Sequence, residues 1–391
     1  MGIDSGSPPL SILQILEKGR FNTGSVVQMF ELARGLALRG HRVAVVSRRE
    51  GEVPERCHAE RLDFVALPLR HEFDLSSARS LGKVYEERKA DVVHAHKGIA
   101  HSAALFATYF SRRRPAIVVN RGVSFPLDPF NRLKYHVRLD AVVTVCQDIK
   151  DVVVASGRVP PEKVHVIYAG VDLTRFDPAR ADGGKIRREW AIAEGEPLLL
   201  QVGAREWKGW RDLFEAARLL APEFPKLVTA VVACKNAAEE EKVAAVAREK
   251  GIGERVRTIG FRSDMPDVLA AADIVVDMSY EGLGITGTLR EAMALGTPVV
   301  GSAAGGNPEL VEDEVSGLLV PPRDAEALAR AVARLLKDPE LGARLALRGR
   351  ERVAKGFSTE VRLDRIEALY RRLTAGRAIA GARAGARSRR T

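Results

Sequence analysis

The stretch 280-YEGLGITGTLREAMALGTPVVGSAAGGNPELV-311 decides how the second half of the chain folds. It follows the apolar run ADIVVDM, passes through a glycine-rich loop into the helical pattern TLREAMALG, and continues into a second apolar run. A strand, a glycine turn, a helix and another strand are the repeating unit of doubly wound α/β domains. The loop GLGITG, residues 282–287, also fits the dinucleotide fingerprint G-x-G-x-x-G. Its surroundings must therefore decide between a dinucleotide and another phosphate-bearing ligand.

Short apolar runs alternate with amphipathic segments along all 391 residues. Their near-continuous Val, Ile, Leu and Ala content is typical of strands in parallel sheets covered by helices on both faces. We therefore predict an α/β protein with two Rossmann-like, doubly wound domains. The predicted strands are residues 11–16, 42–47, 91–96, 116–120, 141–145 and 164–168 in the first half, and 197–203, 227–233, 256–260, 273–278, 297–302 and 317–321 in the second.

Domain boundaries follow from interruptions of this pattern. Pro, Gly and charged residues interrupt it at 176–190, which predicts a hinge there. We expect one domain over residues 1–178, a second over 179–356, and an amphipathic helix over 357–375. The remaining Ala, Gly and Arg residues, 376–391, are predicted to be a disordered basic tail.

Charge and cysteine content limit the classes of function. The last 21 residues carry seven Arg and no acid, so +7 of the formal +10 charge lies there, which argues against nucleic-acid binding by the folded body. Cys57, Cys146 and Cys234 have no metal spacing and are expected to be buried, reduced thiols. No run approaches the roughly 18 apolar residues of a membrane span, and no secretory signal is recognisable, so a cytoplasmic location is expected.

The dinucleotide interpretation fails on the strand that follows the loop. A dinucleotide site has an acid at the end of the next strand, about 20 residues on, but TPVVGSAAGG ends in Ser, Ala and Gly. The loop still suits an anion, because Gly282, Gly284 and Gly287 permit close backbone approach. The N–H groups of Gly287, Thr288 and Leu289 stand where a helix begins, which favours negative charge.

Two carboxylates, Glu281 and Glu291, flank this loop. Carboxylates bind hydroxyl groups rather than phosphate. A phosphate site between two hydroxyl-binding carboxylates describes a nucleotide sugar.

With these features the sequence resembles family 4 of the retaining glycosyltransferases, which have the GT-B architecture of two facing Rossmann-like domains. The resemblance covers nearly the whole chain, and four segments in the family's order carry it. It implies metal-independent transfer of a sugar from a nucleotide-diphosphate sugar, with retention, to a hydroxyl acceptor such as lipopolysaccharide or a lipid-linked glycan. It also implies a C-terminal helix that crosses back to the N-terminal domain. The segments are NTGSVVQMFELARGLALRGHRVAVVS (22–47), VIYAGVDLTRFDP (166–178), QVGAREWKGWRDLFEAARLL (201–220) and EGLGITGTLREAMALGTPVVGSAAGGNPELV (281–311).

The resemblance implies a role for particular residues. Arg205 and Lys208 would grip the donor diphosphate, which agrees with the chemistry of two cations just after a strand. Glu281 would bind the sugar and Glu291 the ribose, while the turn at residues 260–262 would bind the base through its backbone. The implied donor-side residues are Gly24, Gly203, Arg262, Gly282, Leu283, Gly284, Gly287, Thr288, Leu289 and Glu291, beside the catalytic Arg205, Lys208 and Glu281.

Two features depart from the family's pattern. Glu281 and Glu291 are ten positions apart rather than eight, and counting back eight from Glu291 reaches Leu283. A two-residue bulge that leaves Glu281 in its role is favoured over a change of residue. In the first domain, Arg121 stands where the family often has a His. Because Arg is not a base at neutral pH, it is predicted to position the acceptor electrostatically.

Three histidines crowd one predicted strand end in DVVHAHKGIAH, residues 91–101. No acid joins them, so a structural role for His94 and His101 is favoured over metal ligation. The family places acceptor-side groups near this strand end, so His96 is assigned to the acceptor side together with Arg121. We expect no metal and no cofactor beyond the nucleotide-sugar co-substrate.

Two alternatives share the same donor site: a GT-B nucleotide-sugar epimerase or hydrolase, and an inactive nucleotide-sugar-binding protein. The altered spacing of Glu281 favours the second of these.

A separate hypothesis concerns an anionic membrane surface, which would place the chain on the inner face of the cell membrane. The segment FPLDPFNRLKYHVRL, residues 125–139, mixes Phe125, Phe130 and Tyr135 with cations. The arginines at 112–114 and the basic tail would add to it. Solvated basic helix ends explain this composition equally well.

Overall fold

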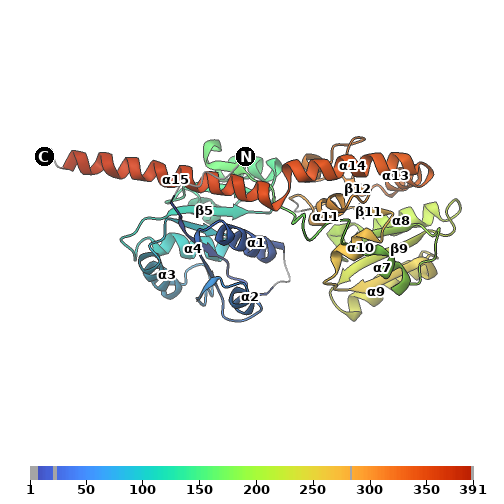
Figure 1. The fold of residues 1–391 in the computed structure, drawn as a ribbon, viewed down its shortest axis with the longest axis horizontal. Coiled ribbons are helices and arrows are strands. Elements are labelled where there is room, and N and C mark those ends of the chain that lie inside the picture. The colour runs from blue at the N-terminus through green and yellow to red at the C-terminus, as the bar shows by residue number, and fades with distance from the viewer. Residues whose placement is uncertain (1–7, 21–23, 282–283, 389–391) are drawn as a thin grey trace. The chain divides into compact units, whose positions relative to one another are not determined.

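The computed structural model describes residues 8–20, 24–281 and 284–388, and the chain divides into two compact units (Figure 1). Unit 1 contains Met1–Ile167 and Thr359–Thr391, and unit 2 contains Tyr168–Ser358. Each unit has its own parallel sheet and its own buried core.

Unit 1 is built on a seven-stranded sheet in the order β3-β2-β1-β4-β5-β6-β7, in which all paired strands are parallel. The order reverses between β1 and β4, and open α/β sheets bind ligands where the strand order reverses, at the carboxyl ends of the strands. The strands are Ser11–Ile15 (β1), Arg42–Ser47 (β2), Asp63–Ala66 (β3), Val92–Ala95 (β4), Ala116–Arg121 (β5), Ala141–Thr144 (β6) and Val164–Val166 (β7). The helices are Gly24–Leu38 (α1), Val53–Ala59 (α2), Leu75–Glu87 (α3), Gly98–Ala107 (α4), Pro129–Lys134 (α5), Gln147–Gly157 (α6), Thr359–Ser388 (α15) and the short Pro161–Lys163 (η1).

Unit 2 repeats this plan with a six-stranded parallel sheet in the order β10-β9-β8-β11-β12-β13. Its strand order reverses between β8 and β11. The strands are Leu198–Val202 (β8), Val228–Cys234 (β9), Val256–Gly260 (β10), Ile274–Asp277 (β11), Val299–Ser302 (β12) and Leu318–Val320 (β13). The helices are Gly183–Glu189 (α7), Trp210–Leu220 (α8), Ala237–Glu249 (α9), Met265–Ala270 (α10), Gly287–Leu295 (α11), Asn307–Leu310 (α12), Ala325–Lys337 (α13) and Pro339–Gly356 (α14), with the short turns Glu206–Lys208 (η2) and Gly253–Arg255 (η3).

The structure confirms the prediction of two Rossmann-like sheets, and each predicted strand segment forms a strand. The prediction omitted β3, a four-residue strand at the edge of the sheet. Its first residue, Asp63, is exposed and the other three are half-buried. An edge strand needs little apolar surface, so its signal in the sequence is weak.

The division between the units lies earlier than predicted, after Ile167 rather than after residue 178. The residues in between pack on unit 2. The Tyr168 hydroxyl donates to Glu309 at 3.0 Å, and the Val171 N–H donates to the carbonyl of Phe357 at 2.9 Å. Val171 and Phe176 are buried in the core of unit 2. These tertiary contacts, which the local sequence does not show, move the boundary.

Helix α15 confirms the predicted C-terminal helix that returns to the first unit (Figure 1). Leu363, Ile366 and Tyr370 are buried in the core of unit 1. Gly35 in α1 makes room for this packing, because a Cβ at Gly35 would stand 2.5 Å from a methyl carbon of Leu363. A larger residue at position 35 would therefore push α15 away.

The helix extends further than the sequence predicted. We expected it to end at residue 375 and to be followed by a disordered tail, but α15 continues to Ser388. Ala and Arg, which dominate this segment, are strong helix formers. Arg377 also pairs with Asp140 at 2.6 Å, so the helix is anchored beyond its predicted end.

All eight histidines of the chain lie in unit 1. Burial lowers the pKa of His94 and of His101 to about 3 and lowers the pKa of His96 well below its usual range. These three rings are neutral at ordinary pH, and protonating them in the folded state would place a charge where water cannot reach it.

Acidification from about pH 7.5 to about pH 5 should therefore destabilise unit 1 and leave unit 2 nearly unchanged. Above the unfolded-state pKa of about 6.5, a His ring is neutral in both states, so it has no effect. Between that value and about 3, only the unfolded chain binds the proton, so stability falls as the pH falls. At pH 5 the loss is about 2 kcal/mol for each such ring.

The measurement has an internal control, because Trp190, Trp207 and Trp210 are the only tryptophans of the chain and all lie in unit 2. Tryptophan fluorescence therefore follows the unfolding of unit 2, while circular dichroism follows both units. Equal shifts of the two signals with pH would contradict the prediction.

Candidate active site

Two left-handed glycines shape the loop after β8, where the strand order of unit 2 reverses. Gly203 has φ of 99° and Gly209 has φ of 71°. At Gly209 a Cβ would stand 2.3 Å from the carbonyl oxygen of Met278, so only glycine fits there. The loop is therefore held against the segment after β11, and the Tyr280 N–H donates to the carbonyl of Trp207 at 3.0 Å.

Lys208 is held by a buried carboxylate. Its Nζ lies 3.1 Å from Oδ2 of Asp277, the last residue of β11, whose side chain is fully buried. The other oxygen of Asp277 accepts from the Ser279 N–H at 3.1 Å, and the carbonyl of Lys208 accepts from Gln201 Nε2 at 3.0 Å. The ammonium is fixed in place, and the Lys208–Asp277 pair is neutral overall.

Arg205 lies on the same loop and differs from Lys208 in its surroundings. Its side chain is exposed, and within the described part of the chain it forms no ion pair. The net positive charge that this loop can offer to an anion therefore comes from Arg205, while Lys208 offers its remaining N–H donors.

Helix α11 begins at Gly287, and a buried asparagine fixes this start. Asn307 Oδ1 accepts from the N–H of Thr286 at 3.2 Å and from its hydroxyl at 3.1 Å, and Asn307 Nδ2 donates to the carbonyl of Ser302 at 3.2 Å. The side chain of Leu289 is fully buried, so only its backbone can serve a ligand. The first turn thus presents N–H groups from a rigid position, as an anion site requires.

The two predicted carboxylates flank this turn in sequence. Glu291 belongs to the first turns of α11, and its Oε1 would lie 3.8 Å from a Cβ built on Gly287. Glu281 is exposed. The predicted two-residue bulge falls on Gly282 and Leu283, which lie outside the described residues, so the sugar-binding role of Glu281 stays a prediction. Gly284 is tied down, since its carbonyl accepts from the Gly306 N–H at 3.3 Å.

The structure places the Arg262 side chain in an ion-pair network. Its guanidinium donates to Asp264 at 2.7 Å and to Glu189 at 3.0 Å, and these two carboxylates raise the Arg262 pKa. The neighbouring Phe261 is 78% exposed. The turn at 260–262 therefore offers backbone groups and an aromatic ring, while the charge of Arg262 is already neutralised.

In unit 1, the two acceptor-side residues line one cavity of about 360 Å³ at the carboxyl ends of β4 and β5. His96 comes from the end of β4 and Arg121 from the end of β5, and Ser25, next to the predicted Gly24 at the start of α1, also lines it. Tyr135 completes this wall. Burial raises the Tyr135 pKa, and the Arg121 guanidinium partly offsets this effect.

His96 is oriented by a buried chain of hydrogen bonds that ends on α15. Gln14 Nε2 donates to the Tyr370 hydroxyl oxygen at 3.2 Å, which leaves the Tyr370 hydrogen for His94 Nδ1 at 2.6 Å. The Gln14 carbonyl oxygen then accepts from His96 Nε2 at 2.6 Å. This order assigns the proton of neutral His96 to Nε2 and leaves Nδ1 unprotonated.

The described acids, histidines and cysteines offer no candidate metal site. In the part of the chain that the structure describes, no group of three or more His, Cys, Asp or Glu side chains could hold a metal ion. Cys57, Cys146 and Cys234 are buried and are not joined in disulfides, as predicted. Within residues 8–20, 24–281 and 284–388, no helix has the length and apolar character needed to cross a bilayer.

Two Rossmann-like units, each with a parallel sheet whose strand order reverses, together with a C-terminal helix that returns to the first unit, define the GT-B architecture. Residues 182–352 match the family described as "Glycosyl transferases group 1", and residues 22–175 match "Glycosyltransferase Family 4". The chain belongs to the family-4 glycosyltransferases of group 1.

Two curated relatives and one solved structure illustrate the similarity. The chain is 25% identical over 369 residues to the N-acetyl-alpha-D-glucosaminyl L-malate synthase of Bacillus anthracis, covering 89% of this chain and 93% of that protein. It is 26% identical over 320 residues to the UDP-Gal:alpha-D-GlcNAc-diphosphoundecaprenol alpha-1,3-galactosyltransferase of Escherichia coli, covering 76% and 79%. Anabaena Alr3699/HepE, solved in complex with UDP, shares the fold with a TM-score of 0.80 at 20% identity, covering 92% and 99%.

Replacing Lys208 by Met should destabilise unit 2 by about 3 kcal/mol, because the buried Asp277 carboxylate would lose its counter-charge. The second substitution Asp277→Asn should recover part of this loss, since it removes the unpaired charge. Urea unfolding followed by tryptophan fluorescence measures both effects. Lys226→Met, at an exposed lysine of unit 2, is the matched control, and a Lys208→Met variant as stable as this control would contradict the pairing.

Proposed function

We propose that this glycosyltransferase moves a sugar from a nucleotide-diphosphate sugar, with retention and without a metal, to a hydroxyl of a cell-envelope or lipid-linked glycan. The observation that carries the proposal is the arrangement after β8 and β11, where Arg205, Lys208 and the start of α11 offer donors to an anion. The relative that uses UDP-Gal and a diphospholipid-linked acceptor supports the choice of donor and acceptor class.

The chemistry requires stabilisation of a departing diphosphate. The bond between the anomeric carbon and the diphosphate oxygen breaks, and a bond from the acceptor oxygen to the same face of that carbon forms. Arg205 and the N–H groups of α11 would stabilise the developing negative charge, and Lys208 would add a hydrogen bond. The acceptor proton passes to the leaving phosphate oxygen. No protein base is assigned, because an arginine such as Arg121 is not a base at neutral pH and because buried His96, whose pKa is well below its usual range, binds protons weakly.

Binding of nucleoside diphosphates tests the donor assignment directly. UDP, GDP, ADP, CDP, dTDP and NAD are compared by thermal unfolding followed through the tryptophans of unit 2. A ligand at about 100 times its Kd adds about 2.7 kcal/mol, so one nucleoside diphosphate should raise the unfolding temperature by several degrees. Stabilisation by NAD alone would overturn the proposal. Product analysis with the matching sugar nucleotide then separates transfer from epimerisation or hydrolysis, and no turnover would mean an inactive binding protein.

Replacing Arg205 by Ala should lower kcat/KM by roughly 10- to 150-fold, which corresponds to about 1.5–3 kcal/mol for a charged hydrogen bond in the transition state. Arg218→Ala is the matched control, because Arg218 is an exposed residue of α8 that pairs with Glu215 at 2.6 Å. Equal activity of the two variants would remove Arg205 from the mechanism.

We also propose that unit 1 binds an anionic membrane surface, which would place the enzyme on the inner face of the cell membrane. The structure narrows the surface predicted from the sequence. Lys134 is buried and pairs with Glu72, and Tyr135 is buried, so neither can contact lipid. The side chain of Phe130 lies outside the described residues. Phe125 and Leu133, which are 54% and 61% exposed, remain as apolar contacts.

Unit 1 also exposes an aromatic ring beside a cation. Arg138 stacks on the exposed ring of Tyr109 at 4.2 Å, and its guanidinium donates to the carbonyl of Thr108 at 3.2 Å. Aromatic side chains beside cations suit the interface of an anionic bilayer.

The double substitution Phe125→Ser and Leu133→Ser should weaken binding to phosphatidylglycerol vesicles severalfold, measured by co-sedimentation. Leu347→Ser, at a 60% exposed leucine of unit 2, should leave binding unchanged. Equal sedimentation of the wild-type protein with phosphatidylcholine and phosphatidylglycerol vesicles would contradict membrane binding through charge.

A further inference from the structure

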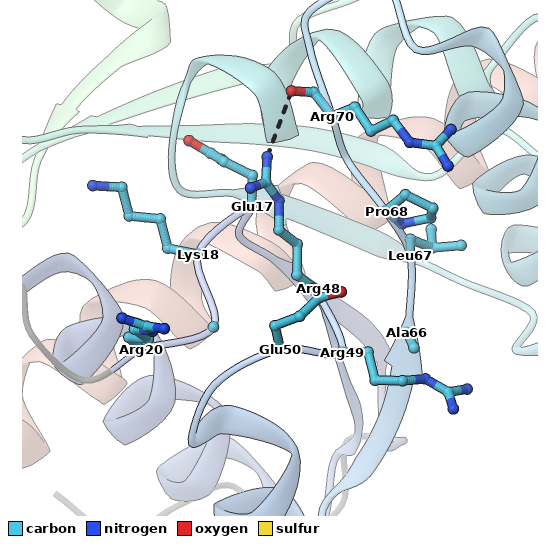
Figure 2. Close-up of a pocket in the computed structure, with 11 residues that line it drawn as sticks. Glu17, Lys18, Arg20, Arg48, Arg49, Glu50, Ala66, Leu67, Pro68 and Arg70 are labelled. Carbon is cyan, nitrogen blue, oxygen red and sulfur yellow. Dashed lines mark hydrogen bonds between the residues drawn. The ribbon is translucent and has the colours of Figure 1, made fainter.

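A cavity of about 930 Å³ in unit 1 has a strongly basic lining (Figure 2). The segments that follow β1, β2 and β3 form it, with residues 17–20, 48–50, 66–68 and 70 in its wall. We call it the arginine cavity. Neither the donor site nor the His96 cavity shares its lining residues.

The charge of this lining is unbalanced. Five of its side chains are cations and two are acids, namely Lys18, Arg20, Arg48, Arg49 and Arg70 against Glu17 and Glu50.

The two acids do not neutralise these cations. In the described structure, Lys18, Arg20, Arg49 and Arg70 form no ion pair with a carboxylate. The buried Glu17 carboxylate is directed to α4, where its Oε2 accepts from the Ala100 N–H at 3.3 Å. Like charges kept together repel one another, so an anionic ligand would be favoured here.

The three segments are joined by hydrogen bonds and a close backbone contact, so the backbone positions that carry the cations are fixed relative to one another. Arg48 Nη2 donates to the carbonyl of Leu69 at 2.7 Å and so joins the segment after β2 to the segment after β3. The same nitrogen lies 3.5 Å from the carbonyl oxygen of Arg70, and Figure 2 draws this second contact as a dashed line. Ser47 Oγ donates to the carbonyl of Lys18 at 3.1 Å, which ties β2 to the segment after β1. Gly19 is needed there, since a Cβ would stand 1.9 Å from the carbonyl oxygen of Glu50.

Arg48 stands at the centre of this arrangement (Figure 2). Its Nε–H is buried and has no hydrogen-bond partner among the residues that the structure describes. A buried donor without a partner is unfavourable unless a ligand or water satisfies it. Guanidinium groups match phosphate oxygens in geometry and charge, so a phosphate would satisfy the donor and the surrounding charges together.

The arginine cavity adjoins the cavity that holds His96 and Arg121. Lys18 of the first and Lys97 of the second are close enough that Lys18 contributes, after burial, to lowering the Lys97 pKa. Both cavities open at the carboxyl ends of the strands beside the reversal between β1 and β4. A phosphate in the arginine cavity would therefore leave a connected sugar next to His96.

We propose that the arginine cavity binds a phosphate or diphosphate group of the acceptor, so that the acceptor is a phosphorylated glycan. This inference rests on the proposed function, because the acceptor exists only if the chain transfers a sugar. The same chemistry has two sources, a soluble sugar phosphate and the head group of a lipid-linked glycan.

Calorimetric binding of inorganic pyrophosphate tests the site. The variant Arg49→Gln/Arg70→Gln removes two exposed cavity cations and should weaken binding at least tenfold. Arg42→Gln, an exposed arginine at the opposite end of β2, should leave it unchanged, and Arg205→Ala separates any binding at the donor loop. Equal affinity in the cavity variant and in Arg42→Gln, or loss of binding in Arg205→Ala alone, would overturn the proposal.

Two further arms identify the source of the phosphate. Glucose 1-phosphate represents a soluble acceptor, and phosphatidylcholine vesicles with and without phosphatidic acid represent a lipid head group. If the cavity variant loses binding in either arm, that result supports the site and identifies the source of the phosphate. If the variant binds like the wild-type protein in both arms, the proposed site is overturned.

A last measurement separates this proposal from the proposed function. Nucleoside diphosphates should stabilise unit 2 of the Arg49→Gln/Arg70→Gln variant as much as they stabilise unit 2 of the wild-type protein. If no nucleoside diphosphate stabilises the wild-type protein while pyrophosphate binding still depends on Arg49 and Arg70, the donor assignment fails and the phosphate site stands as a site without an acceptor role. If the protein binds the nucleotide but the cavity substitutions do not change its affinity for pyrophosphate, only the proposed phosphate site is overturned.

Discussion

The reversal of strand order in a parallel sheet is the constraint on which the rest of this molecule depends. Parallel strands joined by crossover helices place the strand ends, and the starts of the helices that directly follow them, on the same edge of a sheet, and the reversal leaves that edge open. In unit 2 this brings Arg205, Lys208 and the start of α11 to neighbouring strands. In unit 1 the same geometry gathers His96 and Arg121 in one cavity and the arginine cavity beside it.

Ion pairs with carboxylates determine which cations of the chain are left to bind a ligand. Arg262 and Lys134 are held by carboxylates, so they stabilise the fold rather than offer free charge. Lys208 is an intermediate case, because Asp277 fixes its position while leaving N–H donors. By contrast, Arg205, in the loop after β8, is exposed. The proposed function therefore relies on the few cations whose charge the fold leaves unbalanced.

Much of the fold and part of the site could be predicted. Apolar runs long enough to cross a sheet identified the central strands, but not the edge strand β3, which buries too little to leave a pattern. The glycine loop and Thr288 at the start of α11 followed from local chemistry. Asp277 was missed because it meets Lys208 across 69 positions of sequence, and Asn307 was missed because a local pattern does not show that it would fix Thr286. The sequence predicts Arg262 on the donor side, whereas the structure pairs its guanidinium with Asp264 and with Glu189, which is distant in sequence.

The sequence by itself determined the class of fold, because periodicity and glycine placement are local properties, and the resemblance of four of its segments indicated the family. Only the tertiary structure decided which charges are neutralised, where the units divide, and that Tyr370 of the last helix orients His96 through Gln14. These features arise from contacts between residues far apart in the chain. The arginine cavity belongs with them, because its cations come from three separate segments that become one surface only when β1, β2 and β3 pair.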